Sequence, residues 1–126
     1  MAILTVATAT DSPNKSSEAK RILISGDGAD ATTVIAASTT GYQHIVTKCH
    51  VSWNGGGAEN IAIKSGTTTL HTIYLIALAT NFDIPPGLIY TAEDEALIFD
   101  KSAATGIASI MLEYVTVIPG SYVGLL

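Results

Sequence analysis

The chain has 126 residues, of which 48% are hydrophobic and only 13% are charged, about half the usual charged share. Its net charge of −5 and its scattered basic residues argue against nucleic-acid binding, and its single cysteine excludes an intrachain disulfide. The longest apolar run, residues 73–79, is far too short for a membrane-spanning helix of roughly 20 residues. We therefore expect one domain, with neither nucleic acid nor membrane as a partner and with much of its surface covered by other proteins.

The N-terminal 20 residues are expected to form an arm and linker outside the domain. Residues 3–8 are β-prone, and residues 11–19 are polar and include Pro13, as in a flexible connection. The first residues have no basic start and become polar by Thr5, unlike a secretory signal, so we expect synthesis in a cytoplasm. One short helix at most is expected, near residues 13–20.

Short strands separated by turn residues are expected from residue 21 onward. Residues 21–25 and 32–37 flank a turn rich in glycine and aspartate. In residues 42–53 the odd positions are mostly apolar and the even ones mostly polar, which predicts a half-buried strand with Cys49 as a small core residue. Three consecutive glycines, residues 55–57, then predict a turn that closes a hairpin with residues 61–63.

The second half of the chain continues the β pattern. Residues 69–79 are apolar on both faces in their later half, which predicts a strand covered on two sides. Pro85 and Pro86 predict a stiff break, followed by a strand that begins near Leu88. The last two strands are predicted at residues 96–100 and 107–118. With about eight strands and no sustained helical period, residues 21–118 are expected to form an all-β domain, an antiparallel β-sandwich of jelly-roll type.

Residues 119–126 are expected to form an apolar C-terminal tail. Such a segment exposed on a monomer would lower its solubility, so we expect it to be buried against another protein. Burial of its four large apolar side chains supplies on the order of 6 to 12 kcal/mol before ordering costs are subtracted. Together with apolar residues of the arm, the predicted interface comprises Ile3, Leu4, Val6, Tyr122, Val123, Leu125 and Leu126.

No group of residues has the spacing of a catalytic or metal site, so we expect neither an enzyme nor a cofactor. His44 and His50 share one face of their predicted strand but lie about 20 Å apart along it, too far to bind one metal. One histidine repeated around the axis of an oligomer is the alternative metal site. Residues 93–95 are consecutive acids, which are typical of a solvated turn. Cys49 and His50 point to opposite faces and cannot pair for nucleophilic catalysis.

Most of the domain resembles small structural proteins of bacteriophage virions. The resemblance lies in residues 41–46 (Gly-Tyr-Gln-His-Ile-Val), residues 61–70, the Pro-Pro-Gly break at 85–87 and residues 92–98 before a long final strand. It spans roughly residues 32–117 and neither terminus. Such proteins include head decoration proteins and modules of tails and fibres. The resemblance implies a jelly-roll, a symmetric oligomer that is commonly a trimer, and no catalytic residue.

These features predict a structural virion protein that binds the outside of a phage capsid, contacts the major capsid protein and stabilises the shell through multivalent contacts. Its location would be the capsid surface of the virion. The alternative is a tail, fibre or adhesin module that binds a host receptor or a glycan. That module would use the loops at residues 54–57 and 93–95, with aromatic rings such as Trp53 and Tyr90 stacking on sugars.

Overall fold

The computed structural model describes residues 4–8, 20–38 and 41–119, which form nine β-strands and no helix. The strands are β1 (Thr5–Thr8), β2 (Lys20–Gly26), β3 (Thr32–Ile35), β4 (Gln43–Trp53), β5 (Glu59–Ser65), β6 (Thr68–Leu75), β7 (Thr80–Ile84), β8 (Leu97–Lys101) and β9 (Ala108–Val117). Eight of them, β2 to β9, belong to the predicted body, as expected. The ninth, β1, comes from the predicted arm. The described part of the chain therefore contains no helix that could cross a bilayer.

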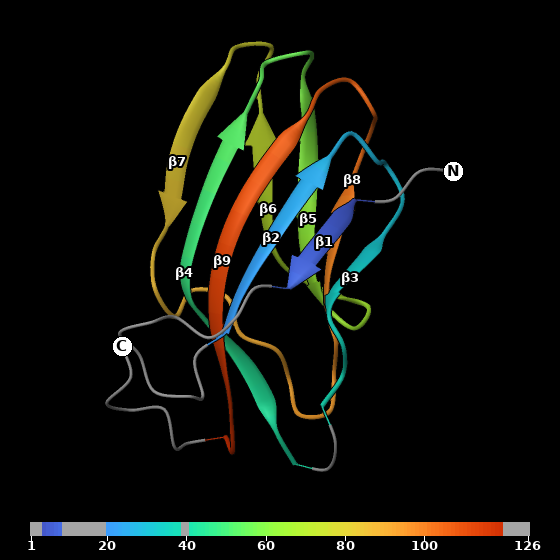
Figure 1. The fold of residues 1–126 in the computed structure, drawn as a ribbon. Helices are drawn as coiled ribbons and strands as arrows, with labels where there is room; N and C mark the ends of the chain where they lie inside the picture. Colours follow the sequence, from blue (N-terminus) through green and yellow to red (C-terminus); the bar gives the residue numbers. More distant parts are fainter. Residues whose placement is uncertain (1–3, 9–19, 39–40, 120–126) are drawn as a thin grey trace.

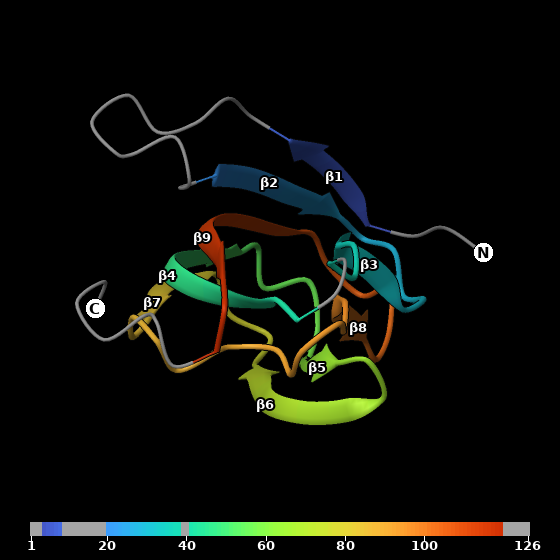
Figure 2. The same ribbon diagram turned by 90° about the horizontal axis from the view of Figure 1, so that it is seen from below.

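The strands form two sheets that face each other as the layers of a sandwich (Figure 1, Figure 2). The five-stranded sheet has the order β1-β2-β9-β4-β7, and the four-stranded sheet has the order β3-β8-β5-β6. Every pairing between neighbouring strands is antiparallel. The prediction of an antiparallel β-sandwich is confirmed.

The order of the strands is that of a jelly-roll. β2 pairs with β9, β3 with β8, β4 with β7, and β5 with β6. The second half of the chain therefore runs back along the first, and successive pairs of this double ribbon lie alternately in the two sheets. As a result, the loops β4–β5, β6–β7 and β8–β9 all lie at one end of the sandwich, at the top of Figure 1.

Alternating side chains build the core between the sheets. In β5, Ile61 and Ile63 are fully buried while Ala62 between them faces outward, and Ile63 pairs with the buried Phe99 of β8. From the other sheet, Val51 and Leu112 close the core. Cys49 is buried beside them, as predicted. Its burial, reinforced by the carboxylate of Asp83, raises the pKa of the thiol to about 12, so Cys49 has too little thiolate to act as a nucleophile at neutral pH.

Part of the predicted arm belongs to the sandwich. β1 pairs with β2 in a register that places Val6 opposite Ile24. Just before β1, Leu4 is 2% exposed in the main core, and its backbone N–H donates a hydrogen bond to Thr32 Oγ1 at 3.1 Å. Residues 4–8 therefore act as an edge strand of the domain, and β2 begins at Lys20, inside the segment predicted as arm and linker.

Three segments differ from the predicted strand positions. Residues 80–84 form β7, a strand that was not predicted. Its polar residues are tolerated because β7 is an edge strand with one outward face. The strand predicted near Leu88 is absent there, and only a single bridge joins Tyr90 to Ile45. β6 ends at Leu75, and the apolar residues 76–79 form an exposed loop instead of a strand covered on both faces.

Candidate functional site

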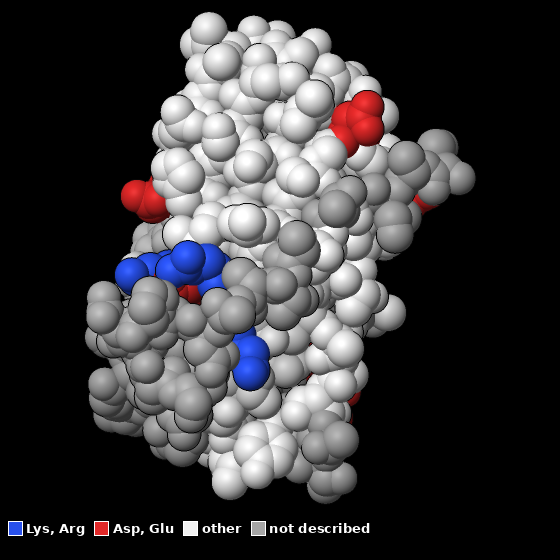
Figure 3. All heavy atoms as spheres, in the orientation of Figure 1, with Lys and Arg blue, Asp and Glu red and all other residues white. Residues whose placement is uncertain are grey.

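Two surfaces of the sandwich combine exposed apolar residues with an unusual distribution of charge, one at each end. The first, which we name the apical surface, consists of the loops at residues 54–58, 76–79 and 102–107. Its large exposed side chains are Ile76, Leu78 and Ile107, which are 59%, 62% and 52% exposed. None of the residues in these three loops is charged. In Figure 3, where the same end is at the top, no Lys or Arg is visible there.

Hydrogen bonds hold the loops of the apical surface together. Trp53, at the end of β4, is 2% exposed, and its Nε1 donates to the carbonyl oxygen of Ile76 at 2.9 Å. Asn54 Oδ1 accepts from the backbone N–H of Gly56 at 3.1 Å and of Ile107 at 2.9 Å. The β4–β5 loop and the end of β4 thus bond the other two loops, and the backbone that carries their exposed side chains is held in place.

The tight contact between these loops requires glycine. Gly55 has a positive φ of 74°, and a Cβ at this position would collide with the backbone of Leu78 and Ala79. A Cβ on Gly56 would collide with the backbone of Thr105 and Gly106. The predicted glycine turn is therefore present, and its function is to let three loops pack side by side.

A buried ion pair lies beneath the apical surface. Lys101 Nζ and Glu59 Oε1 are 2.5 Å apart, and both side chains are 0% exposed. Lys101 also donates to the carbonyl oxygens of Ala103 at 3.0 Å and Gly106 at 3.2 Å, so its three ammonium protons all have acceptors. Glu59 Oε2 accepts from the backbone N–H of Thr105 at 3.1 Å and also from Thr105 Oγ1. The pair therefore positions the β8–β9 loop.

The sequence carries a signal for this pair. In β5, Glu59 occupies the inward position two residues before Ile61, and in β8, Lys101 follows the buried Phe99 in the same way. Two opposite charges that extend the apolar faces of two strands indicate a buried ion pair.

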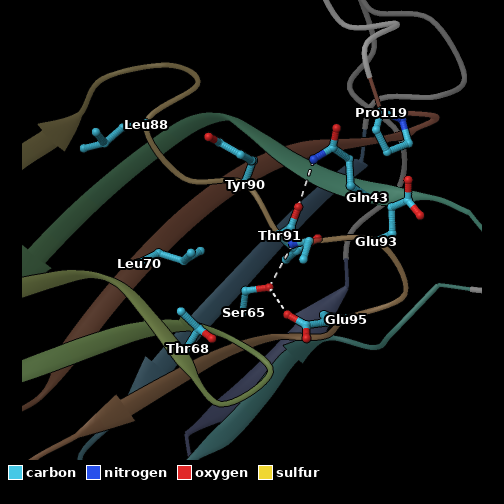
Figure 4. Close-up of a pocket in the computed structure, with 11 residues that line it drawn as sticks. Gln43, Ser65, Thr68, Leu70, Leu88, Tyr90, Thr91, Glu93, Glu95 and Pro119 are labelled. Carbon is cyan, nitrogen blue, oxygen red and sulfur yellow. Dashed lines mark hydrogen bonds between the residues drawn. The ribbon is translucent and has the colours of Figure 1, made fainter.

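The second surface, which we name the end pocket and which Figure 4 shows in close-up, is lined by the start of β4 and therefore lies at the opposite end of the sandwich. It is an open cavity of about 490 Å³ between the start of β4, the turn between β5 and β6, and the segment that joins β7 to β8. Its lining is Gln43, Ser65, Thr68, Leu70, Leu88, Tyr90, Thr91, Ala92, Glu93, Glu95 and Pro119. The only charged residues in this lining are the two glutamates.

The two predicted interface residues that the structure describes, Leu4 and Val6, belong to neither surface. Leu4 is a core residue, and Val6 is half-buried against the same core, so both pack within their own chain. The other five, Ile3, Tyr122, Val123, Leu125 and Leu126, lie outside the described residues. Sequence reasoning missed Ile76, Leu78 and Ile107, which the predicted strand boundaries had placed within strands.

The histidines do not meet. His44 is buried, with Nε2 2.8 Å from the carbonyl oxygen of Ala36 and Nδ1 2.8 Å from Thr116 Oγ1. Because a carbonyl only accepts, Nε2 carries the proton in the neutral ring, and desolvation lowers the pKa of His44 despite its hydrogen bond to Ala36. His50 pairs with Asp83 at 2.7 Å on the surface. Among the described residues, no three His, Cys, Asp or Glu side chains form a cluster that could hold a metal ion.

The two loops predicted to recognise a glycan are separated by the length of β4. The glycine turn follows Trp53 at one end of that strand, and the N–H of Asp94 bonds the carbonyl oxygen of Tyr42 just before the other end, at 2.9 Å. The eleven residues of β4 span about 30 to 35 Å. The loops therefore cannot form one recognition surface. Trp53 is a core residue, whereas Tyr90 is 49% exposed and lines the end pocket.

Comparison with known proteins yields only limited similarity. No protein-family model matches this chain, and no curated protein matches it. Four solved chains match. One of them belongs to a structure described by the words "Bacillus endospore appendages form a novel family of disulfide-linked pili". The similarity to that chain has a TM-score of 0.43 and 14% sequence identity, over 92% of each chain. A similarity of this degree supports no inference about the partners, activity or location of this protein.

Proposed function

We propose that this chain is a non-enzymatic structural protein that binds the outside of a phage capsid as a symmetric oligomer and stabilises the shell. The proposed partner is the major capsid protein, the proposed oligomer is a trimer, and the proposed location is the virion surface. The identity of the particle rests on the sequence resemblance. The observation that carries a binding function is the apical surface, where three loops without charge expose Ile76, Leu78 and Ile107.

The energetics of the apical surface suit attachment through several weak contacts. Three large apolar side chains that are about half exposed supply on the order of 3 to 5 kcal/mol when they are buried, before association costs. One such contact gives weak binding, but an oligomer that uses several at once gains avidity. Because hydrogen bonds and the buried ion pair already hold the loops, little conformational entropy is lost on binding.

A tail, fibre or adhesin module that binds a host receptor or glycan is the second candidate. The observation in its favour is the end pocket, whose lining includes the exposed ring of Tyr90. In this case the protein would act through its acidic end, and the apical surface would serve assembly of the tail or fibre.

Immunogold electron microscopy of virions from a lysate that contains the protein tests the first proposal. Label spread over the heads is the expected result. Label confined to tails would favour the second candidate, and particles without label would exclude both.

Substitutions then test the role of the apical surface. The double variant Ile76→Ser and Leu78→Ser should reduce retention on particles by about tenfold or more, because it removes most of the exposed apolar area of the β6–β7 loop. The matched control is Leu23→Ser, which changes a 47% exposed residue on the outer face of β2. Equal retention of the two variants would contradict a role for the apical surface.

A further inference from the structure

The end pocket holds an acceptor that lacks a donor. Gln43 lines the pocket and is 6% exposed, and its Nε2 donates to the carbonyl oxygen of Thr91 at 2.9 Å. Because that carbonyl can only accept, the amide orientation is settled, and the atom left without a hydrogen-bond partner is Gln43 Oε1. In Figure 4 the amide oxygen points away from Thr91. A buried acceptor without a partner is costly, and a ligand that donates a hydrogen bond would satisfy it.

The charged groups of the pocket are also acceptors. Glu93 is exposed at its rim, and Glu95 is half-buried with Oε1 2.6 Å from Ser65 Oγ, which donates to it. The same Ser65 Oγ accepts from the backbone N–H of Ala92 at 2.9 Å, which fixes the direction of its own proton. No basic side chain is present in the lining to neutralise the two carboxylates. Charge complementarity therefore favours a cationic ligand.

An apolar wall faces these acceptors. Leu70, Leu88 and Tyr90 are 37%, 47% and 49% exposed, and Figure 4 shows them on the side of the pocket away from Gln43 and Glu93. Exposed apolar side chains beside acceptors suit a ligand that has both an aliphatic stem and a charged donor group. The ring of Tyr90 can also stack on a planar cation.

From this arrangement we infer that the end pocket binds an arginine side chain of a partner protein. A guanidinium carries five N–H donors in a planar fork, which suits a lining whose free polar groups are acceptors, and its three methylene groups match the apolar wall. A lysine ammonium lacks the planar face for Tyr90, and a neutral saccharide leaves the two carboxylates without a counter-charge. The identity of the partner as a particle protein rests on the proposed function, whereas the arginine chemistry does not.

The test is an NMR titration of the full chain, labelled with ¹⁵N, with the peptide acetyl-Gly-Arg-Gly-amide. The control peptide has citrulline in place of arginine, which keeps the shape and removes the charge. The arginine peptide should shift the amide resonances of residues 65–70 and 88–95 in a saturable way, and citrulline should bind at least about tenfold more weakly. Equal binding of the two peptides, or shifts located elsewhere, would overturn the inference.

Variants locate the bound cation. Glu93→Gln should weaken the arginine peptide about threefold or more, because it removes one charge at the rim without altering a hydrogen bond of Glu95. Tyr90→Ala should also weaken it, through loss of stacking. The control Asp27→Asn removes an exposed carboxylate from the β2–β3 loop, away from the pocket, and should leave the affinity unchanged. If it weakens binding as much as Glu93→Gln, the effect is one of net charge and the inference fails.

The same sample separates this inference from the proposed function. Arginine binding without labelling of particles would sustain the pocket and refute the capsid assignment. Labelling of heads together with equal affinity for the arginine and citrulline peptides would support the capsid assignment and refute the arginine pocket. Shifts of the pocket resonances by neutral oligosaccharides, with none by the arginine peptide, would instead make the pocket a glycan site and overturn the arginine assignment.

Discussion

At the apical end of the sandwich the charged residues Glu59 and Lys101 are buried and the surface is apolar, whereas at the other end Glu93 and Glu95 line an open pocket. The buried charges satisfy each other and the backbone of one loop, so they fix the shape of a surface that carries no charge itself. The two pocket acids, of which Glu93 is exposed and Glu95 half-buried, have no basic neighbour in the pocket lining and can interact with a ligand. Charge therefore has a structural function at one end and is available for binding at the other.

The largest expected effect comes from breaking the buried ion pair. Lys101→Met leaves the carboxylate of Glu59 buried without a counter-charge and should lower the free energy of unfolding by about 3 to 5 kcal/mol. The double variant with Glu59→Leu should recover most of this loss, because it removes both charges. Urea unfolding of the two variants measures the difference.

The matched control is Lys64→Met, in the pair Lys64–Asp100 on the outer face of the same sheet. Its atoms are 3.0 Å apart, and its side chains are 27% and 34% exposed, so solvent screens the interaction. Its loss should cost less than about 1 kcal/mol. Similar costs for Lys101→Met and Lys64→Met would show that burial does not distinguish the two pairs.

A second prediction compares the edge strand with the outer face of the sandwich. Leu4→Ala should lower the free energy of unfolding by about 2 to 4 kcal/mol, because Leu4 is 2% exposed in the main core. Leu23→Ala, at a side chain that is 47% exposed, should change it by about 0.5 kcal/mol or less. Thermal or urea unfolding gives both values. If the two variants cost the same, residues 4–8 do not contribute to the core.

A smaller effect is expected from His44, whose pKa is lowered by burial from its usual 6.5. As the pH falls, the unfolded chain therefore takes up a proton at this histidine at a higher pH than the folded chain does. The contribution of His44 to the free energy of unfolding is fully present above about pH 6.5 and decreases as the pH drops below that value. His44→Gln should remove this slope. Urea unfolding between about pH 7.5 and 5.5 measures it, a range above the usual pKa of carboxylates. A slope that persists in His44→Gln belongs to another group.

The period-two pattern predicted much of the fold because side-chain alternation is a local property of a strand. Residues 42–53 contain β4, and residues 107–118 contain β9, which together form the centre of the larger sheet. β7 was missed because an edge strand tolerates polar residues on its outer face. Leu4 was assigned to an interface because sequence does not reveal whether an apolar arm packs on its own domain or on another.

The candidate sites were largely beyond sequence reasoning. Gln43 and Thr91 are separated by 48 positions, so their hydrogen bond and the unpaired oxygen beside it exist only once β4 and the segment after β7 are adjacent. The acidic run at residues 93–95 was correctly identified as a turn outside the strands. The proximity of this run to the apolar wall of Leu70, Leu88 and Tyr90 was not predicted, because these residues converge only at the end of the folded sandwich.

The sequence by itself determined the class of this protein: an all-β chain with low charge, with strands whose alternation defines a sandwich and with glycines where loops turn. The tertiary structure alone decided which ends of the strands meet. The jelly-roll brings together three uncharged loops above a lysine and a glutamate 42 positions apart, and it brings an unpaired amide oxygen to an acidic pocket at the opposite end. The physical reason is that burial and alternation are set by neighbours along a strand, whereas a site is built by residues that only the antiparallel pairing of distant strands makes adjacent.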